Sequence, residues 1–150
     1  MKREILKTTF VAGTLDIFGA FAHNYITRQT PPDIILRYIA SGLFGKTAFS
    51  GGGLYPLIGL LCHFLIVLAC VVVYFKLFPR ISLLRKNILL SALLVALVAW
   101  GVTTLLVIPL SKIGTSSFEL SAALTAIAIL YICIGLPIAF FTRQYFKRRM

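Results

Sequence analysis

Asp16 and His63 are the side chains whose types and surroundings best suit proton chemistry. Asp16 lies near the middle of an apolar run, residues 6–27, and His63 lies within a second run, residues 54–78. An imidazole close to a carboxylate in a medium of low polarity can exchange a proton near neutral pH. Ionisable groups inside membrane spans often mark proton or ion paths. The predicted intramembrane polar site comprises the polar side chains of these two runs: Asp16, His23, Asn24, His63 and Tyr74.

The first run predicts a helix with one polar face. Residues at steps of three and four share a face of a helix, and Asp16 recurs at such steps with small or polar residues: Thr9, Gly13, Ala20, His23 and Thr27. An ionised carboxylate at the bilayer centre costs about 2.5–3.5 kcal/mol on insertion scales. We therefore expect this face to meet protein, and the face with Phe18 and Tyr25 to meet lipid.

The composition predicts an all-α membrane protein. Of 150 residues, 59% are hydrophobic and 13% are charged, whereas soluble domains average about 45–50% apolar and about 25% charged residues. About 20 apolar helical residues cross a hydrocarbon core of about 30 Å. We expect one transmembrane domain, residues 1–150, with four spans: residues 6–27, 54–78, 87–110 and 120–141. Gly135 and Pro137 are expected to loosen the last third of the fourth span.

Residues 31–44, between the first two spans, predict a short amphipathic helix. Thr30 is the expected N-cap, followed by proline as the first helical residue. Asp33 and Arg37 are spaced as a favourable ion pair. The segment is too short to span a bilayer, so we expect it to lie on the membrane or to dip into it. Arg37 of this segment and Lys46 of the loop that follows it are expected to lie near the polar site.

The basic residues predict the orientation. With the N-terminus inside, the inner segments hold eleven: Lys2, Arg3, Lys7, Lys76, Arg80, Arg85, Lys86, Arg143, Lys147, Arg148 and Arg149. The outer segments hold four: Arg28, Arg37, Lys46 and Lys112. Cytoplasmic loops carry the excess of Lys and Arg, so both termini are predicted to be cytoplasmic. The expected partners of the basic ends are anionic lipids of the bilayer, and nucleic acid is not expected.

Three other interpretations of these motifs are weaker. Residues 40–47 match a loose phosphate-loop pattern, but the glycines at 51–53 oppose the helix that such a loop needs. The first run mimics a secretory signal with an Ala-x-Ala cleavage site, but Asp16 would interrupt its apolar region. His23 and His63 could ligate haem, yet they lie at different depths. We expect no cofactor or metal, and the cysteines lack metal-ligand spacing: Cys62, Cys70 and Cys133.

Three segments resemble a group of small bacterial inner-membrane proteins with four spans. The segments are AGTLDIFGAF, TPPDIILRYIASGLFGKTAFSGG and GLLCHF. More distantly, the apolar span that contains His63 and ends at Phe78-Pro79 resembles YagU-like inner-membrane proteins. The resemblance covers about the first half of the chain. It implies a bacterial inner membrane and assigns no catalytic residue.

Two functional hypotheses lead, and neither makes the protein an enzyme. An enzyme that acts on lipid or on a haem-borne electron is a third and weaker hypothesis. In the first, the Asp16–His63 core of an integral membrane protein serves proton-linked or small-solute transport. In the second, the chain is a structural or accessory subunit. Its small-residue faces would then pack against a second copy or a partner membrane protein. The third span offers such a face in Ala92, Ala96 and Ala99.

Overall fold

The computed structural model describes residues 1–108, 112 and 119–148, and every regular element within these ranges is helical. The elements in chain order are α1 (Lys2–Arg28), α2 (Pro32–Phe44), α3 (Thr47–Ser50), α4 (Leu54–Leu77), α5 (Ser82–Lys86), α6 (Ile88–Gly101), the π-helical segment η1 (Val102–Val107), α8 (Leu120–Leu130), the π-helical segment η2 (Tyr131–Gly135) and α9 (Leu136–Lys147).

Four helical segments are long and apolar enough to cross a membrane: Lys2–Arg28, Leu54–Leu77, Ile88–Leu105 and Leu120–Lys147. The predicted all-α membrane fold is confirmed. The expected end of the third span at residues 109 and 110 and the basic residue Arg149 lie outside the described residues.

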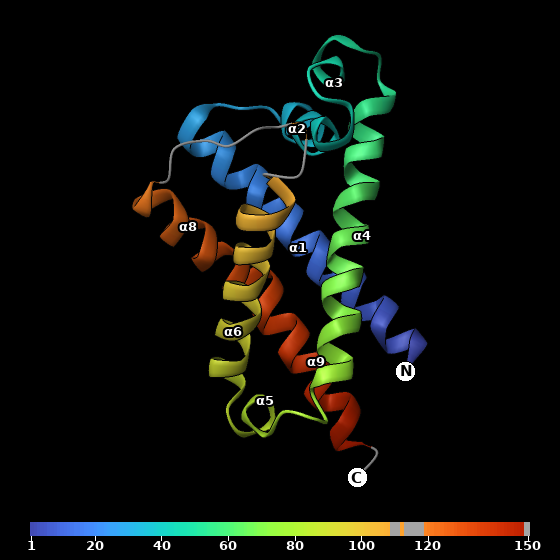
Figure 1. The fold of residues 1–150 in the computed structure, drawn as a ribbon, viewed down its shortest axis with the longest axis vertical. Helices are drawn as coiled ribbons and strands as arrows, with labels where there is room; N and C mark the ends of the chain where they lie inside the picture. The colour runs from blue at the N-terminus through green and yellow to red at the C-terminus, as the bar shows by residue number, and fades with distance from the viewer. Residues whose placement is uncertain (109–111, 113–118, 149–150) are drawn as a thin grey trace.

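The four spans form two pairs that cross each other. In Figure 1, α4 and α6 stand upright, while α1 and the α8–α9 segment run obliquely and antiparallel to each other. The oblique helices are the longer ones. α1 has 27 residues, which is about 40 Å of helix, and Leu120–Lys147 has 28 residues, whereas α4 has 24. A helix longer than the hydrocarbon core is accommodated by tilting. Both chain ends and α5 lie in the lower part of Figure 1, and α2 and α3 lie at the upper end.

The junction between α1 and α2 differs from the expected cap. Gln29 adopts a left-handed conformation with φ 52°, and its N–H donates to the carbonyl of Tyr25, 3.0 Å away. The Thr30 N–H donates to the carbonyl of Asn24 at 3.3 Å and closes the last turn of α1. The N-cap of α2 is Pro31, so the predicted Thr30 N-cap is wrong. Pro31 is extended, as a residue before proline favours, and Pro32 is the first helical residue.

The main core lies between α1, α4, α6 and α9, in the half of the molecule that holds the chain ends. Its largest fully buried side chains include Phe75 of α4 and Ile138 of α9. The predicted alanine face of α6 is buried inside this bundle: Ala92, Ala96 and Ala99. On α1, Phe18 and Tyr25 are exposed, as expected for a lipid-facing side. The small-residue face of α6 thus packs within the chain.

Two glycines allow helix backbones to touch. A Cβ on Gly59 of α4 would lie 2.0 Å from the carbonyl oxygen of Leu36, so α2 presses directly against α4. A Cβ on Gly135 of η2 would lie 2.3 Å from the carbonyl oxygen of Ala92 in α6. Backbone atoms cannot rotate away as a side chain can. These contacts therefore require glycine, as is common where membrane helices approach closely.

The fourth span contains a π-helical segment before its proline, in agreement with the expected loosening there. Pro137 has no N–H, and its ring would crowd the carbonyl of Cys133 in an uninterrupted α-helix. The wider turns of η2, residues 131–135, directly precede Leu136 and Pro137. Single π-helical turns are a common way to fit such a residue within a continuous helix.

We expect Gly59→Ala and Gly135→Ala to destabilise the bundle, because each added methyl group meets a carbonyl oxygen. Overpacking of this kind costs about 1–3 kcal/mol. Gly101→Ala is the matched control, because a methyl group added there would have nothing within 4 Å. Thermal unfolding in detergent, followed by labelling of the half-buried thiols, measures the effect. A midpoint for Gly59→Ala equal to that of Gly101→Ala would contradict the close contact.

Candidate functional site

His63 is held on the face of α4 that packs against α1. Its neighbours at helical spacing, Gly59 and Val67, are buried on the same face. The imidazole Nε2 lies 2.9 Å from the carbonyl oxygen of Gly13. A Cβ on Gly13 would lie 2.6 Å from the ring of Phe64, the residue after His63. The absence of a side chain at Gly13 therefore lets this part of α4 approach α1 closely.

Asp16 lies one turn further along α1 and faces the other ring nitrogen. Its Oδ2 is 4.0 Å from Nδ1 of His63. The two side chains are largely enclosed, with relative exposures of 16% for Asp16 and 10% for His63. The structure thus brings together the carboxylate and imidazole on which the sequence analysis centred. We call these two residues the Asp16–His63 pair.

The Gly13 contact determines which proton of the imidazole is exchangeable. A carbonyl oxygen only accepts hydrogen bonds, so Nε2 must donate and must carry a proton. In the neutral ring, Nδ1 is then a bare acceptor facing the Asp16 carboxyl group. An ionised carboxylate would repel that lone pair. The favourable arrangements therefore place one proton either on the carboxyl group or on Nδ1.

The remaining residues of the predicted polar site lie apart from this pair. Asn24 donates from Nδ2 to the carbonyl of Ala20 at 2.9 Å, within its own helix. The half-buried His23 side chain makes no hydrogen bond or ion pair with the described residues. The ring of His63 contacts the Gly13–Asp16 turn of α1, away from His23.

Tyr74 belongs to a second polar contact. Its hydroxyl group is hydrogen-bonded to that of Ser91 on α6, and both residues are buried. Tyr74 lies eleven positions after His63, which is about 16 Å along a helix. This pair therefore links α4 to α6 well away from the Asp16–His63 pair.

Cys133 of η2 packs against α1, because its sulfur lies 3.0 Å from the Cβ position of Gly19. All three cysteines of the chain are free thiols. Within the described ranges, no three His, Cys, Asp or Glu side chains converge closely enough to hold a metal ion.

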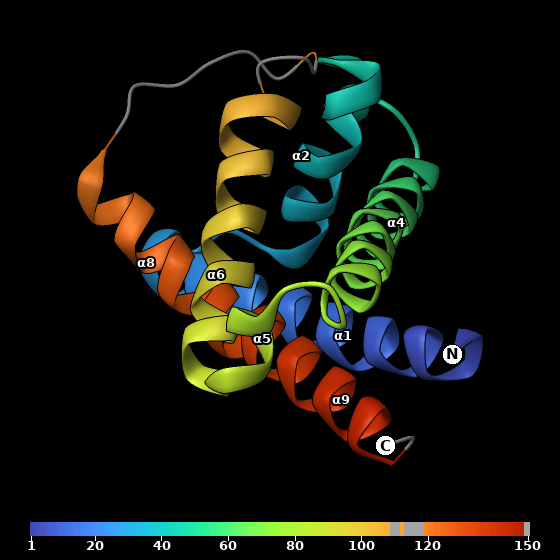
Figure 2. The same cartoon turned by 60° about the horizontal axis from the view of Figure 1, so that its bottom comes forward.

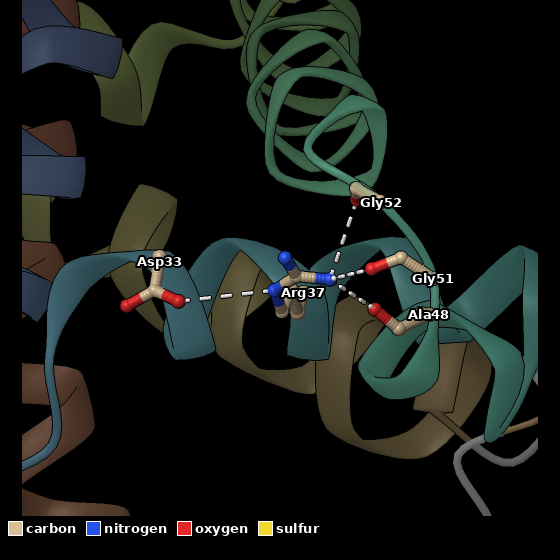
Figure 3. A network of polar contacts seen from close by, with 5 residues as sticks. All are labelled: Asp33, Arg37, Ala48, Gly51 and Gly52. Atoms are coloured by element: carbon tan, nitrogen blue, oxygen red, sulfur yellow. Dashed lines mark hydrogen bonds and ion pairs between the residues drawn. The ribbon is translucent and has the colours of Figure 1, made fainter.

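Arg37 fastens the segment between α2 and α4. Its Nη1 donates to the carbonyl oxygens of Ala48 and Gly51, each at 2.9 Å, and approaches that of Gly52 at 3.5 Å. Asp33 lies on the other side of the guanidinium, with Oδ2 at 3.8 Å from Nε, as expected from the spacing (Figure 3). The guanidinium thus donates hydrogen bonds to carbonyl oxygens of the turn that lack a backbone N–H partner in the part of the chain that the structure describes.

Arg37 and Lys46 serve this turn and make no contact with the Asp16–His63 pair. Lys46 is exposed, and it precedes the four-residue helix α3, Thr47–Ser50. A phosphate loop would need a preceding strand and a longer helix. The part of the chain before Lys46 is entirely described and contains no strand. The phosphate-loop interpretation is therefore excluded by the local fold.

Backbone carbonyls are the partners that sequence reasoning missed. The oxygens of Gly13, Ala48 and Gly51 receive the polar side chains, and any residue type supplies such an oxygen. The available signal was the glycine itself, which permits close backbone approach. Ser91 was also missed as the partner of Tyr74, because nothing in its neighbourhood marks it as different from other small residues of α6.

Comparison with family models, with curated proteins and with solved structures finds no match to this chain.

We expect the neutral ring of His63 to carry its proton on Nε2, because a carbonyl oxygen can only accept a hydrogen bond. The protein has only two histidines, so ¹⁵N NMR of histidine-labelled protein resolves both, and His23→Gln assigns them. His23, which has no fixed partner among the described residues, serves as the internal reference and should show mixed tautomers. A neutral His63 with its proton on Nδ1 would contradict the bond to Gly13.

We expect Arg37→Lys to loosen the turn at residues 48–52. Lysine keeps the charge, but its single ammonium group cannot reach the two carbonyls while a second nitrogen faces Asp33, as Nη1 and Nε of Arg37 do. Loss of a charged hydrogen bond should speed amide exchange there at least about tenfold. Hydrogen–deuterium exchange of the detergent-solubilised protein measures this, with Lys46→Gln as the control. An unchanged rate of amide exchange in Arg37→Lys would show that the turn is stable without the guanidinium.

Proposed function

We propose that this membrane protein handles a proton at the Asp16–His63 pair, in proton-linked or small-solute transport across a bacterial inner membrane. The observation that carries the proposal is the 4.0 Å separation of Asp16 Oδ2 and His63 Nδ1 inside two membrane-spanning helices. An acidic group at this depth is costly, and such groups usually mark ion or proton pathways.

The geometry suits a site that binds and releases one proton. With Nε2 committed to Gly13, the only exchangeable positions are Nδ1 and the Asp16 carboxyl group. Both one-proton forms of the pair are neutral overall, so either can sit in a medium of low polarity. Removing the proton leaves a net negative charge on the pair. The protonated and deprotonated states therefore differ strongly in how well they tolerate the membrane interior.

The separation also leaves room for a change of state. A direct hydrogen bond between oxygen and nitrogen needs about 2.7–3.2 Å, and the two atoms are 4.0 Å apart. His63 is fastened to α1 through Gly13, so rotation of the Asp16 side chain is the smallest movement that closes the gap. Asp16 is also the more exposed partner. We therefore assign it as the group through which the proton enters or leaves.

The orientation in the membrane is part of the proposal. The basic residues expected inside lie on the chain ends, α5 and the adjoining turns of the spans, which occupy one end of the molecule (Figure 1). The segments with the few outer basic residues, α2 and α3, occupy the other end. We infer that both termini face the cytoplasm. The assignment to a bacterial inner membrane rests on the sequence resemblance described above.

The second candidate is a structural or accessory subunit, and the bond from His63 to Gly13 favours it. A hydrogen bond between an enclosed side chain and a backbone carbonyl of another helix fixes the register of α1 and α4 without any proton transfer. In this case Asp16 would lie beside the imidazole without exchanging a proton with it. The two candidates predict different results for the same pair of variants.

The test is proton flux into liposomes that contain the purified protein, driven by a potassium diffusion potential. We expect parent liposomes to acidify faster than empty ones, and Asp16→Asn to lower the rate to that of empty liposomes, since an amide cannot carry the proton. Asp33→Asn is the matched control, because it removes an exposed carboxylate of α2. Equal flux through the parent and Asp16→Asn would end the proton-path proposal.

The thermal stability of the same preparations distinguishes the second candidate from the first. An accessory role predicts no protein-dependent flux, together with a lower unfolding midpoint in His63→Gln. Asp16→Asn should then have a midpoint close to that of the parent, because the bond to Gly13 remains.

A further inference from the structure

A cavity of about 310 Å³ opens between the first turns of α1 and the last turns of α9. Its volume lies at the lower end of the range of about 300–1,000 Å³ for small-molecule sites. The lining residues are Met1, Arg3, Glu4, Lys7, Gln144, Tyr145 and Arg148. The two helices pack against each other along this region, and Figure 2 shows their ends together. The cavity lies at the end of the molecule that holds both termini.

The lining is basic and comes from two facing rows. Arg3 and Lys7 are four residues apart on α1, and Gln144 of α9 is four residues before Arg148, the helical C-cap of α9, so each pair shares a helix face. Three cationic side chains and one carboxylate, that of Glu4, give the side chains of the lining a net charge of +2 (3 − 1). Basic pockets between spans on the cytoplasmic side are suited to anionic headgroups.

Apolar surface lies directly beside the cavity. Lys7 extends over the ring of Phe141, with Nζ 5.1 Å from the ring centroid. Leu6 and Phe10 on the same turns of α1 are exposed, at 61% and 67%. The surroundings thus combine a cationic hollow with an exposed apolar flank, which matches an amphiphile.

We propose that this cavity binds the headgroup of an anionic glycerophospholipid such as phosphatidylglycerol. Arg3, Lys7 and Arg148 would hold the phosphate, and Glu4 and Gln144 would accept hydrogen bonds from headgroup hydroxyls. The acyl chains would lie against Leu6 and Phe10. A soluble phosphate would use only the polar half of the site. A zwitterionic ethanolamine lipid would bring its ammonium group toward three cations and a single carboxylate.

Native mass spectrometry of the detergent-solubilised full chain, titrated with dioleoyl phosphatidylglycerol, tests the proposal. We expect a single tightly bound lipid, with affinity reduced about five-fold for each charge removed in Arg3→Gln/Lys7→Gln. Arg148→Gln tests the same site from the other helix. Arg85→Gln/Lys86→Gln is the control, because it removes two exposed charges of α5 at the same end of the molecule but outside the cavity.

Equal loss of binding in the cavity and control variants would overturn the site, because only diffuse charge would then be at work. Retention of binding in both cavity variants would also overturn it. Glu4→Gln distinguishes the headgroups, since loss of this charge should strengthen phosphatidylglycerol binding and weaken that of phosphatidylethanolamine. Tighter binding of phosphatidylethanolamine to the parent would refute the anionic lipid. Displacement of the lipid by millimolar inorganic phosphate would assign the cavity to a soluble anion.

Discussion

The contact between His63 and the carbonyl of Gly13 positions the two helices that carry the candidate site. A polar side chain inside a bilayer must find a partner within the protein, because neither lipid nor water is there to supply one. His63 finds it in a backbone oxygen of α1, and this choice leaves its second nitrogen facing Asp16. Position 13 therefore contributes to the site through its backbone oxygen alone.

The same logic applies to two further polar side chains, whereas the buried hydroxyl groups of Thr8, Thr9 and Thr142 have no hydrogen-bond partner among the described residues. Arg37 takes its partners from the carbonyls of Ala48 and Gly51, and the Tyr74 hydroxyl takes its partner from Ser91. Each contact joins two elements that are separate along the chain. Direct backbone contacts at Gly59 and Gly135 complete the set. In a membrane, where burying apolar side chains gives little driving force, such close and polar contacts specify how helices associate.

The two ends of the molecule differ in character. At one end, α2 and α3 form a short cap that depends on Arg37 and carries few charges. At the other, the ring of Phe78 stacks on Phe146 at 5.3 Å between centroids, and basic side chains surround a cavity. This asymmetry is what the distribution of Lys and Arg in the sequence implies for a protein with a defined orientation.

Much of this architecture follows from the sequence alone, because a bilayer restricts length and composition severely. The four spans, the short helix between the first two, the lipid-facing side of α1 and the Asp33–Arg37 pair all depend on spacing along a single helix. The error at Thr30 has a local cause: Pro31 precedes Pro32 and is held extended, so the N-cap of α2 falls one residue later than expected. Partners across helices depend on tilt and rotation, which no single helix encodes. Only the tertiary structure could therefore decide that His63 meets the Gly13 carbonyl and Asp16, while His23 stays apart.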